Sequence, residues 1–237
     1  MTMLEPEDRV IMISGANRGI GRATMRELAK RGYRLSLGVR DPASLELSGL
    51  DDKILCFPWN ATKAADSSAW VEATLNHFGQ LDGLVLNAGV LHPVSIEDDL
   101  EPELDEMWDV NFKGPLRLIR AAWPALKPSG QGRVINIVSL AGVRVLSAAN
   151  LGYAASKYAA MALTHAVRQQ GWELGIRATA VCPGLVETDM TKGIDAPEGQ
   201  FKMAPDAIAA TVAYALSLPN DASVAEILVN SRLESTL

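Results

Sequence analysis

Three side chains in the second half of the chain have the types and spacing for proton transfer at an alcohol or carbonyl oxygen. Tyr153 and Lys157 are four residues apart in a helical stretch, so they share one face of the helix. A phenol with a reference pKa of about 10 is a poor base at neutral pH, and we expect the nearby ammonium to lower that pKa. Ser139 follows an apolar strand, and its hydroxyl could hydrogen-bond the reacting oxygen. Together they predict acid–base chemistry on an alcohol and carbonyl pair.

A glycine-rich turn near the N-terminus has the composition of a phosphate-binding loop. The run Ser-Gly-Ala-Asn-Arg-Gly-Ile-Gly at 14–21 lies between an apolar strand and a helix. Glycines allow the backbone to reverse close to a pyrophosphate, and the helix N-terminus offers amide donors and a positive dipole. The spacing of these glycines differs from that of the commonest dinucleotide fingerprint. We expect dinucleotide contacts from Gly15, Asn17, Arg18, Gly19, Ile20 and Gly21.

The end of the second expected strand bears on the choice of cofactor. An enzyme that selects NAD usually has an acid here that accepts hydrogen bonds from the ribose hydroxyls. Arg40 and Arg18 would instead suit a 2′-phosphate, because guanidinium groups bind phosphate through paired hydrogen bonds. We therefore expect NADP(H) and a locally positive cofactor pocket. NAD(H) stays open as an alternative in which Asp41 contacts the ribose and Arg40 is only a solvated residue.

Short apolar runs alternate with amphipathic helical stretches along the chain. The runs are rich in Val, Ile and Leu, as expected of strands covered on both faces. The alternation predicts an α/β fold, a doubly wound parallel sheet of about seven strands in one Rossmann-like domain over residues 1–237. The expected strands are residues 9–14, 34–39, 53–57, 81–86, 132–139, 176–181 and 225–229. The expected helices are residues 19–30, 67–77, 103–112, 115–126, 151–172 and 205–218.

Composition argues against several other classes of protein. The 237 residues carry a net charge of -6 without a basic run, so we expect no nucleic-acid partner. The N-terminus is acidic and no apolar run approaches the roughly 18 residues of a membrane span, so we expect a cytoplasmic protein without a membrane partner. No metal is expected, because the three histidines and two cysteines lack ligand spacing.

The stretch 151–172 is apolar or small nearly all the way round. A helix that lies on a sheet needs only one apolar stripe, so the second face of this one needs a cover. An insertion of the same chain could cover it, but no spare segment is available. We therefore expect a second copy of the chain, in a homodimer or homotetramer.

Six motifs in this order resemble the short-chain dehydrogenase/reductase family, and they span nearly the whole chain. They are the glycine turn, Leu-Asn-Ala-Gly at 86–89, Asn111, Ser139, Tyr-Ala-Ala-Ser-Lys at 153–157, and Pro183-Gly184 followed by Thr188. The ending at 224–231 departs from the family's common Val-Asp-Gly-Gly. It is more similar to NADP-dependent 3-hydroxy acid and serine dehydrogenases, which suggests a small polar hydroxy acid or hydroxy-carbonyl substrate.

The resemblance implies roles for these residues. Tyr153 would be the general acid in reduction and the base in oxidation, with Ser139 polarising the carbonyl. Lys157 would lower the tyrosine pKa and hold the nicotinamide ribose, and Asn111 would anchor a water that links Lys157 to solvent. Asn60 stands where many members have Asp, and its amide oxygen could still accept from the adenine amino group. The implied cofactor contacts are Asn60, Ala61, Asn87, Ala88, Gly89, Tyr153, Lys157, Pro183, Gly184, Val186 and Thr188.

We thus expect an NADP(H)-dependent oxidoreductase that interconverts a secondary alcohol and a carbonyl on a small metabolite. The alternative is a non-catalytic dinucleotide sensor, although such proteins usually lose the tyrosine or the lysine. A methyltransferase would need neither residue. His92 and Arg144 are either substrate contacts or ordinary surface residues, and residues 191–204 are expected to form a lid over the pocket.

Overall fold

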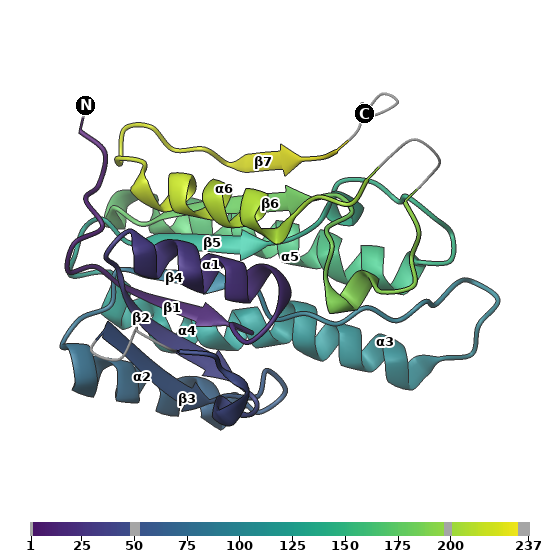
Figure 1. Cartoon of the computed structure of the whole chain (residues 1–237), viewed down its shortest axis with the longest axis horizontal. Coiled ribbons are helices and arrows are strands. Elements are labelled where there is room, and N and C mark those ends of the chain that lie inside the picture. Colours follow the sequence, from purple (N-terminus) through teal and green to yellow (C-terminus); the bar gives the residue numbers. More distant parts are fainter. Residues whose placement is uncertain (1, 48–52, 197–200, 232–237) are drawn as a thin grey trace.

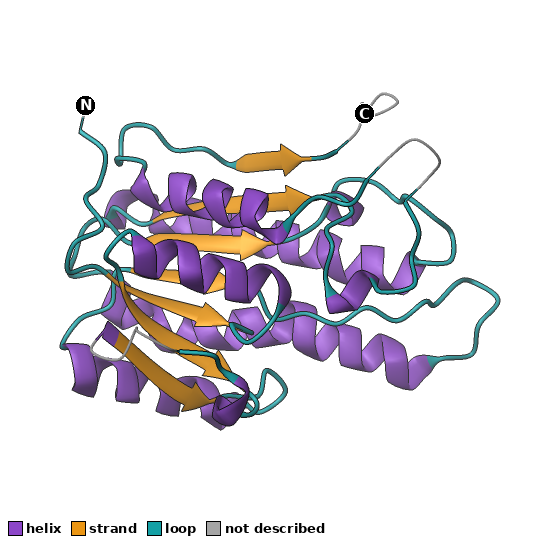
Figure 2. Ribbon diagram, viewed as in Figure 1, coloured by secondary structure: helices purple, strands orange, loops and turns teal. Residues whose placement is uncertain are grey.

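The structure, a computed structural model, describes residues 2–47, 53–196 and 201–231. It has a seven-stranded parallel sheet with helices on both faces (Figure 1, Figure 2), which confirms the predicted doubly wound α/β fold. The strands are β1 Val10–Ser14, β2 Arg34–Val39, β3 Ile54–Pro58, β4 Gly83–Leu86, β5 Arg133–Ile137, β6 Arg177–Pro183 and β7 Glu226–Val229. The α-helices are α1 Gly19–Lys30, α2 Ala64–Phe78, α3 Glu101–Trp108, α4 Gly114–Leu126, α5 Leu151–Gly171 and α6 Pro205–Ser217.

The strand order is β3-β2-β1-β4-β5-β6-β7, and every neighbouring pair is parallel. The chain builds outward from β1 to β3, returns to the centre, and then builds outward from β4 to β7. The connections after β1 and β4 therefore leave the sheet in opposite directions. This is the crevice where open α/β sheets bind ligands, at the carboxyl ends of the strands.

Two apolar layers hold the helices to the sheet. Alternate residues of β1 point to opposite faces, so Ile11 packs in one layer and Met12 in the other. The first layer includes residues of α1 and α6, and the second includes residues of α2, α4 and α5 (Figure 1). Both layers lie beneath the crevice and fix the strand ends that form it.

The chain between β4 and β5 corrects one prediction. Two separate helices were expected at 103–112 and 115–126, but α3, a π-helical turn over Asp109–Lys113 and α4 form one continuous helical run. Pro115 explains the irregular turn. It has no N–H, so it cannot give the ordinary helical hydrogen bond to the carbonyl four residues earlier, which belongs to Asn111.

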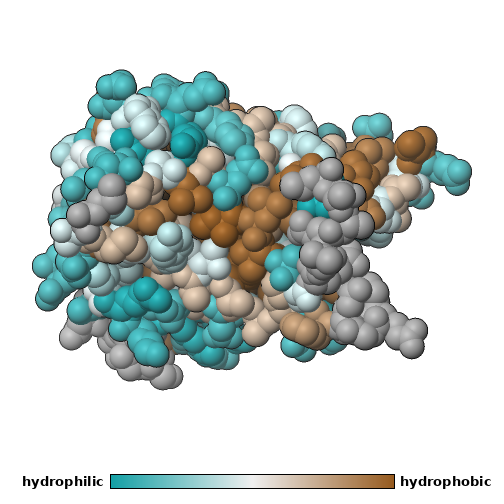
Figure 3. Space-filling model, turned by 90° about the horizontal axis from the view of Figure 1, so that it is seen from above, coloured by the Kyte–Doolittle hydropathy of each residue, from teal (hydrophilic) through white to brown (hydrophobic). Residues whose placement is uncertain are grey.

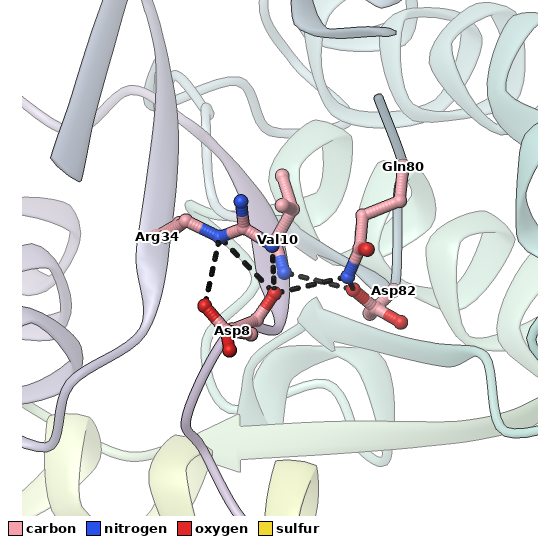
Figure 4. Close-up of polar contacts among 5 residues, drawn as sticks. All are labelled: Asp8, Val10, Arg34, Gln80 and Asp82. Carbon is pink, nitrogen blue, oxygen red and sulfur yellow. Dashed lines mark hydrogen bonds and ion pairs between the residues drawn. The ribbon is translucent and has the colours of Figure 1, made fainter. Parts of the chain in front are cut away.

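A polar network joins the amino ends of the central strands, at the edge opposite the crevice (Figure 4). The carboxylate of Asp82 accepts hydrogen bonds from the backbone N–H of Val10 and from the Gln80 amide, both at 2.8 Å. Gln80 also donates to the Asp8 carbonyl at 2.9 Å, as does Arg34 Nε at 3.1 Å. The network ties the starts of β1 and β2 to the segment before β4.

Within the described residues, no helix combines the length and the apolar character needed to cross a bilayer. The two cysteines are free thiols in or beside strands, with Cys182 buried and Cys56 half-buried.

Candidate active site

A pocket of about 930 Å³ lies along the carboxyl edge of the sheet and extends from the β3 side to the β7 side. Every site residue predicted from the sequence lines it except Gly21 and Asn111. The predicted residues that line it are Gly15, Asn17, Arg18, Gly19, Ile20, Arg40, Asn60, Ala61, Asn87, Ala88, Gly89, Ser139, Tyr153, Lys157, Pro183, Gly184, Val186 and Thr188. One continuous site thus contains both the glycine turn and the catalytic candidates.

The glycine turn has the backbone that its sequence predicts. Gly15 and Gly19 have φ angles of 68° and 52°, which glycine adopts at little cost. A Cβ on Gly21 would lie 2.1 Å from the Gly15 carbonyl oxygen, so this glycine allows α1 to start against the turn. No side chain among the described residues caps α1, so the amides of its first turn face the crevice without a described side-chain acceptor.

Asn87 supports the turn from the end of β4. Its amide donates to the carbonyls of Ser14 and Gly15, both at 3.0 Å. The Ser14 hydroxyl accepts from the backbone N–H groups of Asn87 and Ala88, at 3.0 and 3.1 Å. The ends of β1 and β4 are thereby fixed to each other below the pocket, which holds the turn in one conformation.

At the β2 end of the pocket, one arginine side chain is available to bind an anion. The Asp41 carboxylate accepts from the Ala43 backbone N–H at 3.0 Å, capping the short helix Pro42–Ser44. Arg40 lines the pocket and is exposed, and it has no ion-pair partner among the described residues. Arg18 Nη1 lies 3.7 Å from the carboxylate of Asp189, and both side chains are more than half exposed. Arg40 is therefore the readier of the two for an incoming phosphate.

The Asn60 side chain is hydrogen-bonded within its own loop. Its side-chain oxygen accepts from both the backbone N–H and the hydroxyl of Thr62, each at 3.0 Å. Because two donors already share this oxygen, it is poorly placed to accept from an adenine amino group as well. The part of Asn60 left to face a base is the amide NH₂, which is a donor.

Tyr153, Ser139 and Lys157 meet in the middle of the pocket. Ser139 follows β5, and its hydroxyl hydrogen-bonds the Tyr153 phenol. Lys157 Nζ donates to the Ile137 carbonyl at 2.9 Å and lies 5.7 Å from the Tyr153 ring centre. The predicted trio of a phenol, a hydroxyl and an ammonium is thus assembled from β5 and one face of α5.

The pKa values in this trio differ from the expectation. Burial raises the pKa of Tyr153 to about 12, and the hydrogen bond from Ser139 only partly opposes the rise. Burial lowers the pKa of Lys157 to about 8. The pKa of Tyr153 therefore lies above its ordinary value, opposite in direction to the expected lowering, because burial disfavours the phenolate.

Asn111 lies outside the pocket wall, in the π-helical turn. Its side-chain oxygen accepts from the Val90 backbone N–H, and its amide donates to the Val90 carbonyl and to the Ser156 hydroxyl, all at 2.9 Å. All its side-chain groups thus tie the segment after β4 to α5. This makes the Asn111 side chain a positioning group, because its partner Ser156 directly precedes Lys157.

Several pocket residues were not predicted. Asn230 and Ser231 line the pocket directly after β7, and the rule that ligands bind at carboxyl ends of strands could have found them. Residues of the expected lid also line it, with Pro197 and Gly199 of that segment outside the described residues. Neither His92 nor Arg144 lines the pocket, and the His92 ring lies 2.8 Å from the Glu106 carboxylate.

Comparison with known sequences gives a consistent result over most of the chain. A family model described as short chain dehydrogenase matches residues 9–199. An agropine synthesis reductase of Rhizobium rhizogenes is 38% identical over 218 residues, which are 91% of this chain and 50% of that protein. This chain therefore spans about half the length of that relative. An uncharacterized oxidoreductase of Staphylococcus saprophyticus is 34% identical, over 97% of this chain and 98% of its own.

Solved structures with the same fold include dinucleotide complexes. An alcohol dehydrogenase from the archaeon Thermococcus sibiricus, complexed with 5-hydroxy-NADP, has a TM-score of 0.86 and 31% identity, over 96% of this chain and 99% of its own. A 3-ketoacyl-(acyl-carrier-protein) reductase from Brucella melitensis, complexed with NADH, has a TM-score of 0.87 and 28% identity, over 95% and 98% of the two chains.

Proposed function

Because this chain belongs to the short-chain dehydrogenase family, we propose that it is an NADP(H)-dependent oxidoreductase that interconverts a secondary alcohol and a carbonyl on a small molecule. The observation that carries this proposal is the shared pocket, in which Tyr153, Ser139 and Lys157 line the same space as the glycine turn. A dinucleotide sensor would not need this trio.

The pocket fits a nicotinamide dinucleotide. A Cβ on Gly15 would lie 3.1 Å from Ala88, and a Cβ on Gly19 would lie 3.1 Å from Thr188, so these glycines let the turn lie close to the segments after β4 and β6 that line the same pocket. The uncapped amides of α1 suit a pyrophosphate, and Arg40 with Arg18 suits a 2′-phosphate. When bound, the cofactor would supply or accept the hydride. The solved neighbours bind NADP or NADH, so the preference for NADP(H) depends on these arginines.

Tyr153 and Ser139 would handle the proton and the developing charge. The Tyr153 phenol would give its proton to the substrate oxygen in reduction and take it back in oxidation. The Ser139 hydroxyl would donate a hydrogen bond to the same oxygen, where negative charge develops. A pKa of about 12 keeps the phenol protonated, which suits reduction.

Lys157 and the π-helical turn would return a proton to Tyr153 after each reduction. Lys157, with a pKa of about 8, can exchange protons near neutral pH. The Asn111 carbonyl lacks its ordinary helical donor, because Pro115 stands where that N–H would be. A water held by this carbonyl would complete a path from Lys157 toward solvent, which keeps the proposed role of Asn111 but moves it from the side chain to the backbone.

The setting of the enzyme is part of the proposal. We place residues 1–237 in one domain that acts as a homodimer or homotetramer in the cytoplasm. Exposed apolar residues on α5, including Leu151 and Tyr158, support one interface between copies. β7 pairs on one side only in the described sheet and leaves Leu228 37% exposed, and Figure 3, which looks down on this edge, shows hydrophobic surface over it. This edge supports a second interface.

Replacement of Tyr153 tests the function directly. We expect Tyr153→Phe to lower kcat for ketone reduction with NADPH by about 100-fold or more, because the proton donor is lost. NADPH affinity, measured by fluorescence, should stay within about twofold. The control is Tyr158→Phe, an exposed tyrosine on the same helix, which should keep full activity. An unchanged rate in Tyr153→Phe, or no hydride transfer to any carbonyl in a broad panel, would sink the proposal.

A further inference from the structure

The end of the pocket beyond Ser139 and Tyr153 differs in chemistry from the end at the glycine turn. Its walls come from the segments that follow β4, β5, β6 and β7. Most of its large side chains are apolar: Leu91, Leu146, Leu185, Met190, Ile194 and Phe201.

Several of these apolar side chains are exposed to solvent. The exposed fractions are 50% for Leu146, 38% for Met190, 40% for Ile194 and 68% for Phe201. Large apolar groups that surround a concave site expose surface that an apolar ligand would cover. Covering it would favour binding, because the removal of apolar area from water is favourable.

The charges divide the pocket in the same way. Among the described residues that line it, the lysines and arginines are Arg18, Arg40 and Lys157. The two arginines lie at the glycine turn and the β2 end, and Lys157 is buried against the Ile137 carbonyl. The charged residues at the far end are acids, Glu106 and Asp195. A carboxylate there would meet like charge and no lysine or arginine among the described lining residues, and the neighbouring Lys202 already donates to the Thr191 carbonyl at 2.8 Å, so the environment is unfavourable for it.

We propose that the substrate is a neutral carbonyl compound with an apolar body. Its oxygen lies beside Ser139 and Tyr153, and its body packs against Leu146, Met190 and Ile194. This inference rests on the proposed function and adds the class of substrate to it. It differs from the small polar hydroxy acid that the C-terminal segment suggested.

A matched pair of ketones tests the proposal. Para-acetylbenzoate and its methyl ester have the same ring and the same ketone, and they differ in charge. Because the ester group withdraws more electron density from the ketone, each kcat/KM is divided by the rate at which borohydride reduces the same ketone. We expect kcat/KM with NADPH to be about tenfold or more higher for the ester, because the carboxylate must be desolvated without a cation. An equal or higher value for the carboxylate would overturn the inference while leaving the proposed function intact. If neither ketone reacts, binding of both to the enzyme and NADPH complex decides, measured by calorimetry, with tighter binding of the carboxylate again overturning it.

Two neighbouring substitutions locate the effect in the pocket. Leu146 lines the pocket, whereas Val145, which is 56% exposed, does not. We expect Leu146→Arg to shift the ratio of kcat/KM values toward para-acetylbenzoate by about tenfold or more, because it adds a cation for the carboxylate. The matched control Val145→Arg should leave the ratio within about twofold, and NADPH affinity should be unchanged in both. A shift of the same size in both variants, or in neither, contradicts the placement of the substrate body at Leu146.

Discussion

Lys157 shows how strongly burial controls the pKa of a single side chain. It is 5% exposed, and its ammonium has one described hydrogen-bond acceptor, the Ile137 carbonyl at 2.9 Å. Burial therefore lowers its pKa from 10.5 to about 8, since the charged form loses more hydration than one carbonyl returns. The proposed proton exchange depends on this shift, because an exposed lysine with an ordinary pKa stays protonated at neutral pH.

This low pKa predicts a pH dependence of stability. Between about pH 8 and 10.5 the folded lysine is neutral while the unfolded lysine keeps its proton, so the unfolded state binds more protons and stability rises with pH. We expect the free energy of unfolding of the wild type, relative to Lys157→Met, to increase by about 2 kcal/mol between pH 8 and pH 10. Urea titrations at several pH values measure this difference.

The comparison with Lys157→Met separates the contribution of Lys157 from those of groups that change stability in the opposite direction. Burial raises the pKa of Cys182 to about 11 and that of Tyr153 to about 12, so both lose their protons earlier in the unfolded chain and lower stability as pH rises. The burial contributions are present in both proteins and cancel in the difference, which leaves only the weaker coupling between Lys157 and Cys182. Parallel stability curves for the two proteins would contradict the lowered pKa of Lys157.

The two arginines at the cofactor end predict the basis of cofactor choice. Arg40 has no described ion-pair partner, whereas Arg18 is paired at 3.7 Å with Asp189. We expect Arg40→Ala to weaken NADPH binding by about tenfold and to leave NADH binding within about twofold, because only NADPH carries the 2′-phosphate. Arg18→Ala should have a smaller effect of the same sign. Equal losses for the two cofactors in Arg40→Ala would show that this residue does not read the phosphate.

At the scale of elements, the amino edge of the sheet depends on Asp82. This residue is 9% exposed and receives the first N–H of β1. Burial lowers the pKa of the neighbouring Arg9, and the charge of Asp82 partly opposes that shift. We expect Asp82→Ala to lower the free energy of unfolding by about 2 to 3 kcal/mol, because the buried N–H of Val10 loses its acceptor and the buried Arg9 loses a nearby opposite charge. Asp82→Asn, which keeps an acceptor for Val10, should cost about half as much.

Denaturant titrations measure both variants against a surface control. Asp99→Ala, an exposed acid in the loop before α3, should change stability by less than about 0.5 kcal/mol. Equal effects of Asp82→Ala and Asp99→Ala would show that the network in Figure 4 contributes little.

The elements were predictable where one local rule decides them. Apolar runs found every strand, and glycines with Tyr153 and Lys157 found both halves of the pocket, because such signals act over a few residues. The π-helical turn was missed because it results from Pro115 acting on a carbonyl four residues away. The donor role of the Asn60 amide was missed because it follows from the two hydrogen bonds that Thr62 gives. The predicted direction of the Tyr153 pKa shift was wrong because the burial of this residue depends on the whole fold.

At the scale of the whole molecule, the charge of the chain and the charge of its site separate. The chain has a net charge of -6, yet two arginines line the glycine-turn end of the pocket, beside Asp41 and Asp189, whereas the charged residues that line the far end are the acids Glu106 and Asp195. This division orients a bound dinucleotide, because its phosphates are attracted to one end only. The same division leaves the far end to a partner that carries no negative charge.

The exposed face of α5 predicts how copies of the chain associate. Tyr158 is 42% exposed and Leu151 is 38% exposed, and the intervening Ala155 is small and exposed, so another helix could approach closely. We expect the wild type to be a dimer or tetramer and Tyr158→Arg to raise the dissociation constant of this contact by about 100-fold or more, because two symmetry-related charges would be buried. Sedimentation equilibrium at several protein concentrations measures this.

The control for association is Ile96→Arg, which adds the same charge at an 86% exposed residue in the loop before α3. It should keep the wild-type mass. Because Tyr158 follows Lys157 directly, loss of the contact on α5 should also loosen the helix that carries the catalytic residues. We therefore expect Tyr158→Arg to lose activity in parallel with its loss of mass as the protein is diluted, whereas Tyr158→Phe keeps both. A Tyr158→Arg protein with the wild-type mass would show that copies meet elsewhere, and the open edge of β7 would then be the surface to change.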